Sequence, residues 1–243
     1  MKPLLLLALL STMLAAPSSA AEMVVLLHGV ASSPLQLSRL AVRLKDAGYD
    51  VVNLAYPSRA MSVEKISANW LPAHLRECEA EAAPRLHFVT HSMGGIVLRR
   101  WLATQPRPDN LGHVVMLAPP NAGSEVTDRL RSFPPYHWII GVNAGRLGTR
   151  PTDLPATLGP WPADAPPLGI IAGDRTFNLL FSAWLGGPND GKVAVTRTRL
   201  DGMREGIVLH HSHTLLPLYH DTFVQVRSFL RDGEFDRRLA LRK

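Results

Sequence analysis

Short apolar runs alternate along the chain with longer segments in which apolar residues recur every three or four positions. The short runs are typical of strands buried on both faces, and the longer segments are typical of amphipathic helices. We expect strands within residues 23–27, 49–57, 85–91, 112–120, 168–174 and 206–211. We expect helices within residues 35–48, 62–82, 94–105 and 219–233. This alternation predicts an α/β fold with a parallel sheet and helices on both faces.

The chain has 243 residues, which suits one sizeable domain. Residues 141–167 are rich in proline and glycine, but strands continue after them, so we interpret this stretch as an excursion over the sheet. Residues 1–20 begin with one lysine and a leucine-rich core, shorter than the roughly 20 residues needed to span a bilayer. Small residues follow, which is typical of a signal peptide. We expect a signal peptide over 1–20, a single domain over 22–243, and export to the periplasm or the medium.

The composition is that of a globular protein, with 46% hydrophobic and 19% charged residues. The net charge is +6, but the basic residues are scattered and form no stripe with aromatic residues, which argues against nucleic-acid binding. A transient contact with a membrane surface is compatible with this charge and is not required by it. Cys78 is the only cysteine, so the core must be held by packing without an internal disulfide.

Thr90-His91-Ser92-Met93-Gly94 joins a predicted strand to a predicted helix. A nucleophilic serine occupies such a turn in the G-x-S-x-G pattern, although Thr90 replaces the first glycine here. The competing interpretation is a serine that only caps the helix. The motif alone does not decide between the two.

A serine nucleophile needs a histidine to accept its proton and a carboxylate to orient that histidine. Two carboxylates compete for the second role. Asp174 ends a predicted strand, where it would instead cap the helical stretch that follows. Asp190 lies between Asn189 and Gly191 in a loop that would fix its carboxylate, although Asp-Gly is also an ordinary turn.

Four histidines follow the last predicted strand: His210, His211, His213 and His220. The base should lie beyond the end of that strand and before the closing helix, a place that His213 fits best. His211 and His213 also form an H-x-H pair, but no second cluster of histidine, aspartate or cysteine completes a metal shell. We therefore expect no metal.

The tetrahedral intermediate of acyl transfer also needs hydrogen-bond donors for its oxyanion. The amide of Met93 follows the serine at the start of a helix. Gly29 gives the loop after the first strand the freedom to point the amide of Val30 inward. We expect the oxyanion hole at these two amides.

The segments LLHGVASSP, VTHSMGG, LAPPNAGS, GPNDGKV and HSHTLL occur in this order along the chain. Together they resemble the α/β-hydrolase superfamily, and in particular its small bacterial lipase-like and esterase-like members. The resemblance implies a triad of Ser92, Asp190 and His213, oxyanion amides at Val30 and Met93, and no cofactor. It also implies a minimal fold of about six mostly parallel strands with helices on both faces.

This resemblance implies a serine hydrolase that cleaves small-molecule or lipid carboxylic esters through an acyl-enzyme on Ser92. Residues 119–124 would line its pocket. The apolar segments 133–141 and 177–187 either line an acyl pocket or form a lid, or else pack as ordinary core and loop. Two alternatives remain: an acyltransferase that uses the same triad, and a non-catalytic binding protein with the hydrolase fold.

Overall fold

The computed structural model describes residues 20–240 and contains one six-stranded sheet in the order β2-β1-β3-β4-β5-β6. All five neighbouring pairs of strands are parallel. The strands are β1 (Met23–Leu27), β2 (Asp50–Leu54), β3 (Leu86–His91), β4 (Leu111–Leu117), β5 (Leu168–Gly173) and β6 (Glu205–Leu209). Each strand overlaps one of the predicted apolar runs, so the predicted α/β fold with a parallel sheet is confirmed.

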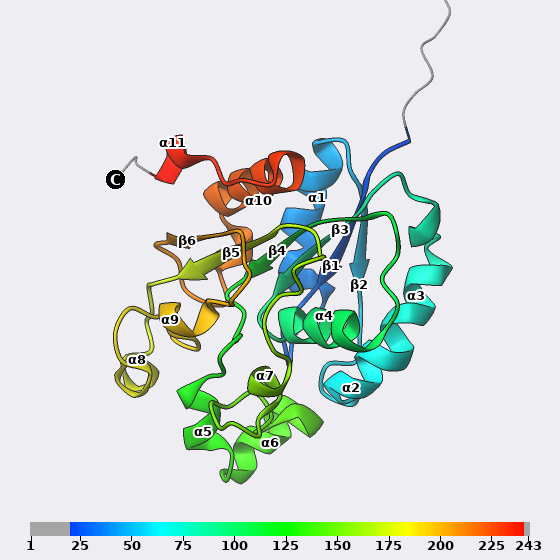
Figure 1. Cartoon of the computed structure of the whole chain (residues 1–243). Helices are drawn as coiled ribbons and strands as arrows, with labels where there is room; N and C mark the ends of the chain where they lie inside the picture. The colour runs from blue at the N-terminus through cyan, green and yellow to red at the C-terminus, as the bar shows by residue number, and fades with distance from the viewer. Residues whose placement is uncertain (1–19, 241–243) are drawn as a thin grey trace, which may run out of the picture.

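Helices cover both faces of the sheet (Figure 1). One face carries η1 (Pro34–Leu37), α1 (Ser38–Asp46), η5 (Leu216–Leu218) and α10 (His220–Asp232). The other carries α2 (Val63–Lys65), the π-helical turn η2 (Ile66–Trp70), α3 (Leu71–Glu77), η3 (Ala80–Ala82) and α4 (Met93–Thr104). The helix predicted within 62–82 thus ends early, because Glu79 adopts a left-handed backbone with a φ of +53°. The last helix is α11 (Arg237–Ala240).

The hydrophobic core forms two layers, one on each face of the sheet. In β1, Met23, Val25 and Leu27 pack on the side of α4, whereas Val24 and Leu26 pack on the side of α1 and α10. All five side chains are buried. A central strand of a parallel sheet is covered on both faces, which explains why its sequence is uninterruptedly apolar.

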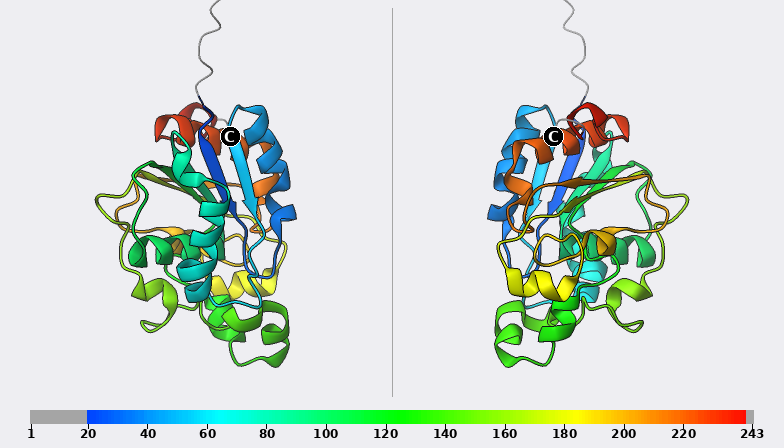
Figure 2. Two further views of the ribbon diagram at one scale, coloured as in Figure 1. Left: turned by 90° about the vertical axis from the view of Figure 1, so that its right-hand side faces the viewer. Right: turned by 90° about the vertical axis from the view of Figure 1, so that its left-hand side faces the viewer.

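The remaining helices gather beyond one end of the sheet (Figures 1 and 2). The chain between β4 and β5 forms α5 (Glu125–Leu130), α6 (Pro134–Ile140), η4 (Gly141–Asn143) and α7 (Leu154–Thr157). The chain between β5 and β6 forms α8 (Leu179–Leu185) and α9 (Val195–Thr198). The arrow of β2 points toward this end, so the carboxyl ends of the strands face these excursions. Ligands of open α/β sheets bind at that edge.

Residues 1–19 lie outside the described part of the chain, and the predicted signal peptide falls almost entirely on them. Across residues 20–240, no helix has the length and apolar character needed to cross a membrane.

Candidate active site

Ser92 lies on the turn between β3 and α4, and its backbone is strained. Its φ of +53° and ψ of −123° fall in a region that residues other than glycine rarely adopt. The residue is buried except for the part that lines a pocket. This geometry is that of a nucleophile elbow. It forms even though Thr90 replaces the first glycine of the motif.

Two glycines allow the chain to close around Ser92. A Cβ atom at Gly94 would lie 2.4 Å from the carbonyl oxygen of Leu27, so α4 reaches β1 only because no side chain intervenes. A Cβ atom at Gly29 would lie 3.1 Å from Nδ1 of His91 and 3.2 Å from Cβ of Ser92. The loop after β1 therefore sits directly against the elbow.

Asp190 and His213 form a buried pair at the carboxyl end of the sheet, where Ser92 also lies. Oδ2 of Asp190 accepts a hydrogen bond from Nδ1 of His213 at 2.7 Å, and both side chains are almost completely buried. Oδ1 of Asp190 accepts bonds from the amides of Lys192 at 2.9 Å and Val193 at 2.8 Å. Because Nδ1 donates to the carboxylate, Nε2 of His213 is left as the proton acceptor.

The backbone reinforces this pair. The amide of His213 donates to the carbonyl oxygen of Asp190 at 3.0 Å, so the two residues are linked by main chain as well as by side chains. Gly191 has a φ of +92°, and a Cβ atom there would lie 2.3 Å from Oγ1 of Thr176. The Asp-Gly turn therefore holds a carboxylate in place and is not an ordinary surface turn.

His91 contacts the backbone of the candidate base His213, and the sequence analysis gave it no role. Its Nε2 donates to the carbonyl oxygen of His213 at 2.9 Å. Complete burial, reinforced by the nearby His213, holds the pKa of His91 well below its usual range, so the ring stays neutral. Its place directly before the candidate nucleophile is the one sequence signal that would have identified it.

The competing groups have partners away from the pocket. Both carboxylate oxygens of Asp174 lie 2.9 Å from Nδ1 of the exposed His210. His211 donates to Asp221 at 2.8 Å and stacks on Tyr219. None of these five residues lines the pocket that contains Ser92.

The expectation that Asp174 caps the following helix is wrong: Asn178 caps α8 through a 2.9 Å bond from the amide of Phe181. Asn178 is the N-cap because it directly precedes the helix, whereas Asp174 is several residues away. His220 is the first residue of α10. Within residues 20–240, no group of three histidine, cysteine or acidic side chains is placed to hold a metal ion.

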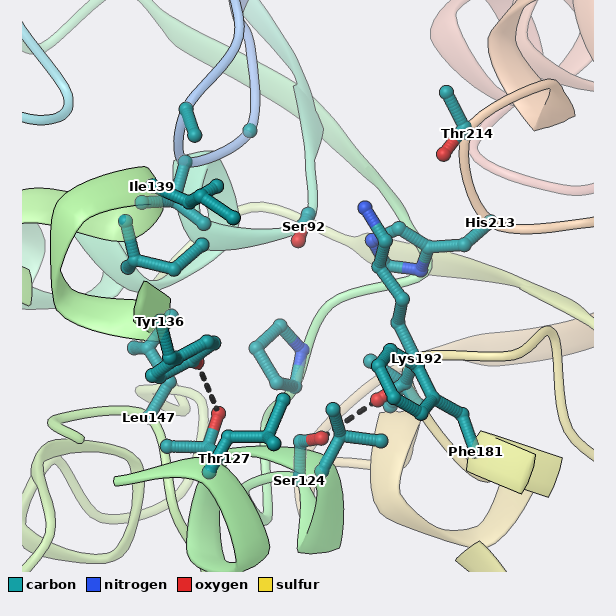
Figure 3. A pocket seen from close by; sticks show the side chains of 18 of the residues that line it. Ser92, Ser124, Thr127, Tyr136, Ile139, Leu147, Phe181, Lys192, His213 and Thr214 are labelled. Atoms are coloured by element: carbon teal, nitrogen blue, oxygen red, sulfur yellow. Dashed lines mark hydrogen bonds between the residues drawn. The ribbon is translucent and has the colours of Figure 1, made fainter. Parts of the chain in front are cut away.

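A pocket of about 590 Å³ opens beside Ser92 and His213 (Figure 3). Its walls come largely from the excursions above the sheet. The segment 133–141 contributes Phe133, Pro135, Tyr136, Ile139 and Ile140, and the segment 177–187 contributes Leu180, Phe181 and Trp184. Both apolar segments therefore line a pocket, which was one of their two interpretations. Pro120 and Ser124 of the segment 119–124 line it as well.

The two backbone amides expected to form the oxyanion hole, those of Val30 and Met93, lie beside Ser92. Val30 lines the pocket, and Met93 begins α4 directly after Ser92. Within residues 20–240, neither amide donates to a backbone or side-chain acceptor. The loop that carries Val30 is fixed by Gln36, whose Oε1 accepts from the amide of Gly29 at 3.3 Å. Helix N-terminal and loop amides of this kind are suited to binding an anion.

A parallel sheet with a strained serine at the turn after β3 defines the α/β-hydrolase fold, in a minimal six-stranded form. No family model and no curated protein sequence matches the chain. Solved structures do match it at low identity, and these likenesses confirm the fold.

Mature lipase BlEst2 from Bacillus licheniformis is 19% identical, with a TM-score of 0.66 over 90% of this chain and 95% of that one. Lipase B from Aspergillus fumigatus is 15% identical, with a TM-score of 0.62 over 90% of this chain and 54% of that one. Phospholipase PlaB from Legionella pneumophila is 19% identical, with a TM-score of 0.59 over 74% of this chain. The match spans only 45% of the length of PlaB.

Proposed function

We propose that this protein is a serine hydrolase that cleaves carboxylic esters through an acyl-enzyme on Ser92. The observation that carries the proposal is the buried Asp190–His213 pair, whose His213 lines the same largely apolar pocket as the strained Ser92. The lipases and the phospholipase among the structural neighbours support an ester as the substrate. Because their sequence identity to this chain is low, the kind of ester must be inferred from the residues of this chain.

In the proposed reaction, Oγ of Ser92 attacks the ester carbonyl carbon while Nε2 of His213 takes the hydroxyl proton. The amides of Val30 and Met93 bind the negative charge that develops on the carbonyl oxygen. His213 then gives its proton to the leaving alcohol as the carbon–oxygen bond to that alcohol breaks. Water repeats the sequence on the acyl-enzyme, releasing a carboxylic acid and restoring the serine. Asp190 holds the imidazole in the required tautomer throughout.

The apolar pocket walls favour an acyl chain as the group that fills the pocket. The two segments that line the pocket also carry large apolar side chains that are exposed: Trp138 is 75% exposed, Phe177 88% and Leu179 79%. Several exposed apolar side chains of this size are unusual for a surface that contacts only water. We therefore include lipid esters among the substrates and a transient contact of these side chains with a membrane surface.

A panel of p-nitrophenyl esters from acetate to palmitate, hydrolysed by wild type and Ser92→Ala, tests the reaction. We expect Ser92→Ala to fold normally and to lose several powers of ten in turnover. A fluorophosphonate probe should label wild type and not the variant. Unchanged turnover in a clean preparation of Ser92→Ala contradicts the mechanism, and absence of labelling in wild type favours a non-catalytic binding protein.

We also propose that the protein is exported with cleavage after Ala20 or Ala21. The proposal rests on the leucine-rich stretch and the small residues that precede these positions. N-terminal sequencing of protein isolated from the cell envelope or medium should return Ala21 or Glu22. An N-terminus at Met1 contradicts export by cleavage.

A further inference from the structure

One cationic side chain, that of Lys192, lines the pocket. Among the pocket-lining residues it is the only lysine, arginine, aspartate or glutamate. Figure 3 shows its side chain extending from the backbone near Ser124 toward the part of the pocket where Ser92 and His213 lie. In the described residues 20–240, its ammonium group has no ion-pair or hydrogen-bond partner. A cation without a counter-ion is therefore aimed at the candidate reaction centre.

The backbone of Lys192 is fixed on both sides, so this placement is built into the turn. Its amide donates to Oδ1 of Asp190 at 2.9 Å, and its carbonyl oxygen accepts from Oγ of Ser124 at 2.6 Å. The carboxylate of Asp190 is already engaged by two amides and by His213. The Asp190 carboxylate therefore attracts the Lys192 ammonium group electrostatically but forms no ion pair with it.

The side chain of Lys192 is exposed to solvent through the open pocket. The largely apolar walls around its ammonium group still lower the pKa of that group, and Asp190 opposes this effect only in part. A ligand that fills the pocket would exclude this water, and an anionic group on it would accept a charge-assisted hydrogen bond from Lys192. The pocket is thus matched to a ligand that is apolar over most of its surface and negatively charged at one point.

The position of Lys192 indicates which part of an ester carries that charge. His213 must protonate the leaving alcohol, so the alcohol part lies on the side of the imidazole. Lys192 lies on this side, whereas Ile139 and the other residues of α6 form the opposite wall (Figure 3). We propose that Lys192 selects esters whose alcohol part carries an anionic group, a phosphate or a carboxylate. This inference rests on the proposed ester hydrolysis and names its substrate class.

The experiment uses a matched pair of chromogenic esters, 4-butanoyloxy-3-nitrobenzoate and its methyl ester. They differ in one negative charge on the alcohol part, and their different intrinsic reactivity cancels when variants are compared. The measured quantity is the ratio of kcat/KM for the anionic ester to that for the neutral ester. In Lys192→Met this ratio should fall about tenfold to a hundredfold, the range expected for a lost hydrogen bond to a charged group. Lys192→Arg should retain most of it.

Lys45→Met is the control, because it removes the same charge from the exposed end of α1, outside the pocket. Its ratio should equal that of wild type. A ratio that is unchanged in Lys192→Met, both for this pair and for the lipid pair described below, overturns the inference. So does an equal loss on both esters with a shifted pH profile, because Lys192 would then act on His213 and not on the substrate. If Lys192→Met fails to fold, Lys192→Gln removes the same charge with a polar side chain and should show the same fall in the ratio.

The neutral ester separates this inference from the proposed function. If wild type hydrolyses the methyl ester and Ser92→Ala does not, ester hydrolysis stands whatever the ratio shows. A second pair, monomeric dihexanoyl phosphatidylglycerol and dihexanoylglycerol, identifies the source of the anion. A lower ratio for this pair in Lys192→Met assigns a lipid phosphate. A lower ratio for the aryl pair alone assigns a small soluble ester, and no change in either pair refutes the selection.

Discussion

The substitution Asp190→Asn tests the candidate triad most directly, because it changes one atom of a buried network. Oδ1 of Asp190 accepts two backbone amides, and Oδ2 accepts the proton on Nδ1 of His213. The single side-chain oxygen of asparagine can accept either from the two backbone amides or from Nδ1 of His213, but not from both. If it keeps the two amides, its NH₂ group faces Nδ1 of His213, and the imidazole must move its proton to Nε2. That tautomer cannot accept the proton of Ser92.

We expect kcat to fall by about 10⁴, the cost of the wrong tautomer in serine hydrolases that use a triad. The stability cost should be much smaller. Two backbone bonds survive and one charge-assisted bond becomes neutral, which costs about 1 kcal/mol. For a domain of this size, that corresponds to a fall in Tm of about 2–4 °C. Loss of turnover should therefore greatly exceed loss of stability.

Asp174→Asn is the matched control, with the same chemical change at the other candidate acid. Its partner His210 is exposed, so the pair contributes at most about 1 kcal/mol, and it lies outside the pocket. We expect nearly full turnover. Both variants are assayed with p-nitrophenyl butyrate and by thermal unfolding. The assignment of Asp190 is refuted if Asp174→Asn abolishes turnover at unchanged Tm while Asp190→Asn remains active.

Three further predictions concern the scaffold. Gly94→Ala should lower Tm strongly or prevent folding, because its Cβ would lie 2.4 Å from the Leu27 carbonyl oxygen. Gly95→Ala should lower Tm less, because its Cβ meets side chains at 3.2 Å or more. Equal Tm values for the two variants would contradict this reasoning. The lowered pKa of His91 means that the folded state binds fewer protons than the unfolded state. The free energy of unfolding, measured with urea, should therefore fall as pH drops below about 6.5, by up to about 1.4 kcal/mol per pH unit. His91→Gln should reduce this slope, and an unchanged slope would assign the effect to other groups. Asn178→Ala should cost about 1 kcal/mol through loss of the cap of α8, which circular dichroism during heating would detect as a lower Tm.

The strands and the serine turn were predictable from the sequence because their signals are local. An apolar run such as Met23–Leu27 is fixed by burial on both faces, and a serine between a strand and a helix is visible in five residues. The early end of the helix after Glu77 was not predictable, since Glu79 adopts its left-handed backbone without a glycine or proline to signal it.

The candidate partners of Ser92 were harder to predict from the sequence, because their positions depend on how distant segments meet. Asp174 and Asp190 follow the same strand, and only the path of the loop through α8 brings Asp190 to His213. The contribution of His91 depends on a bond to a carbonyl oxygen 122 positions away, which no local pattern encodes. The direction of the Lys192 side chain is likewise a property of the folded turn.

The pocket walls come from two separate segments inserted between strands, one between β4 and β5 and one between β5 and β6. This division has a consequence for how substrate specificity can evolve. The insertion between β4 and β5 supplies the apolar wall around α6 and contains none of the proposed triad. Side chains of α6 can change without touching Ser92, Asp190 or His213, whereas Ser124 at the start of this insertion holds the backbone of Lys192 beside Asp190. The insertion between β5 and β6 carries Asp190 and Lys192 on one turn. Under the proposed function, preference for acyl length would therefore change independently of the triad, whereas preference for charge would be inherited together with Asp190.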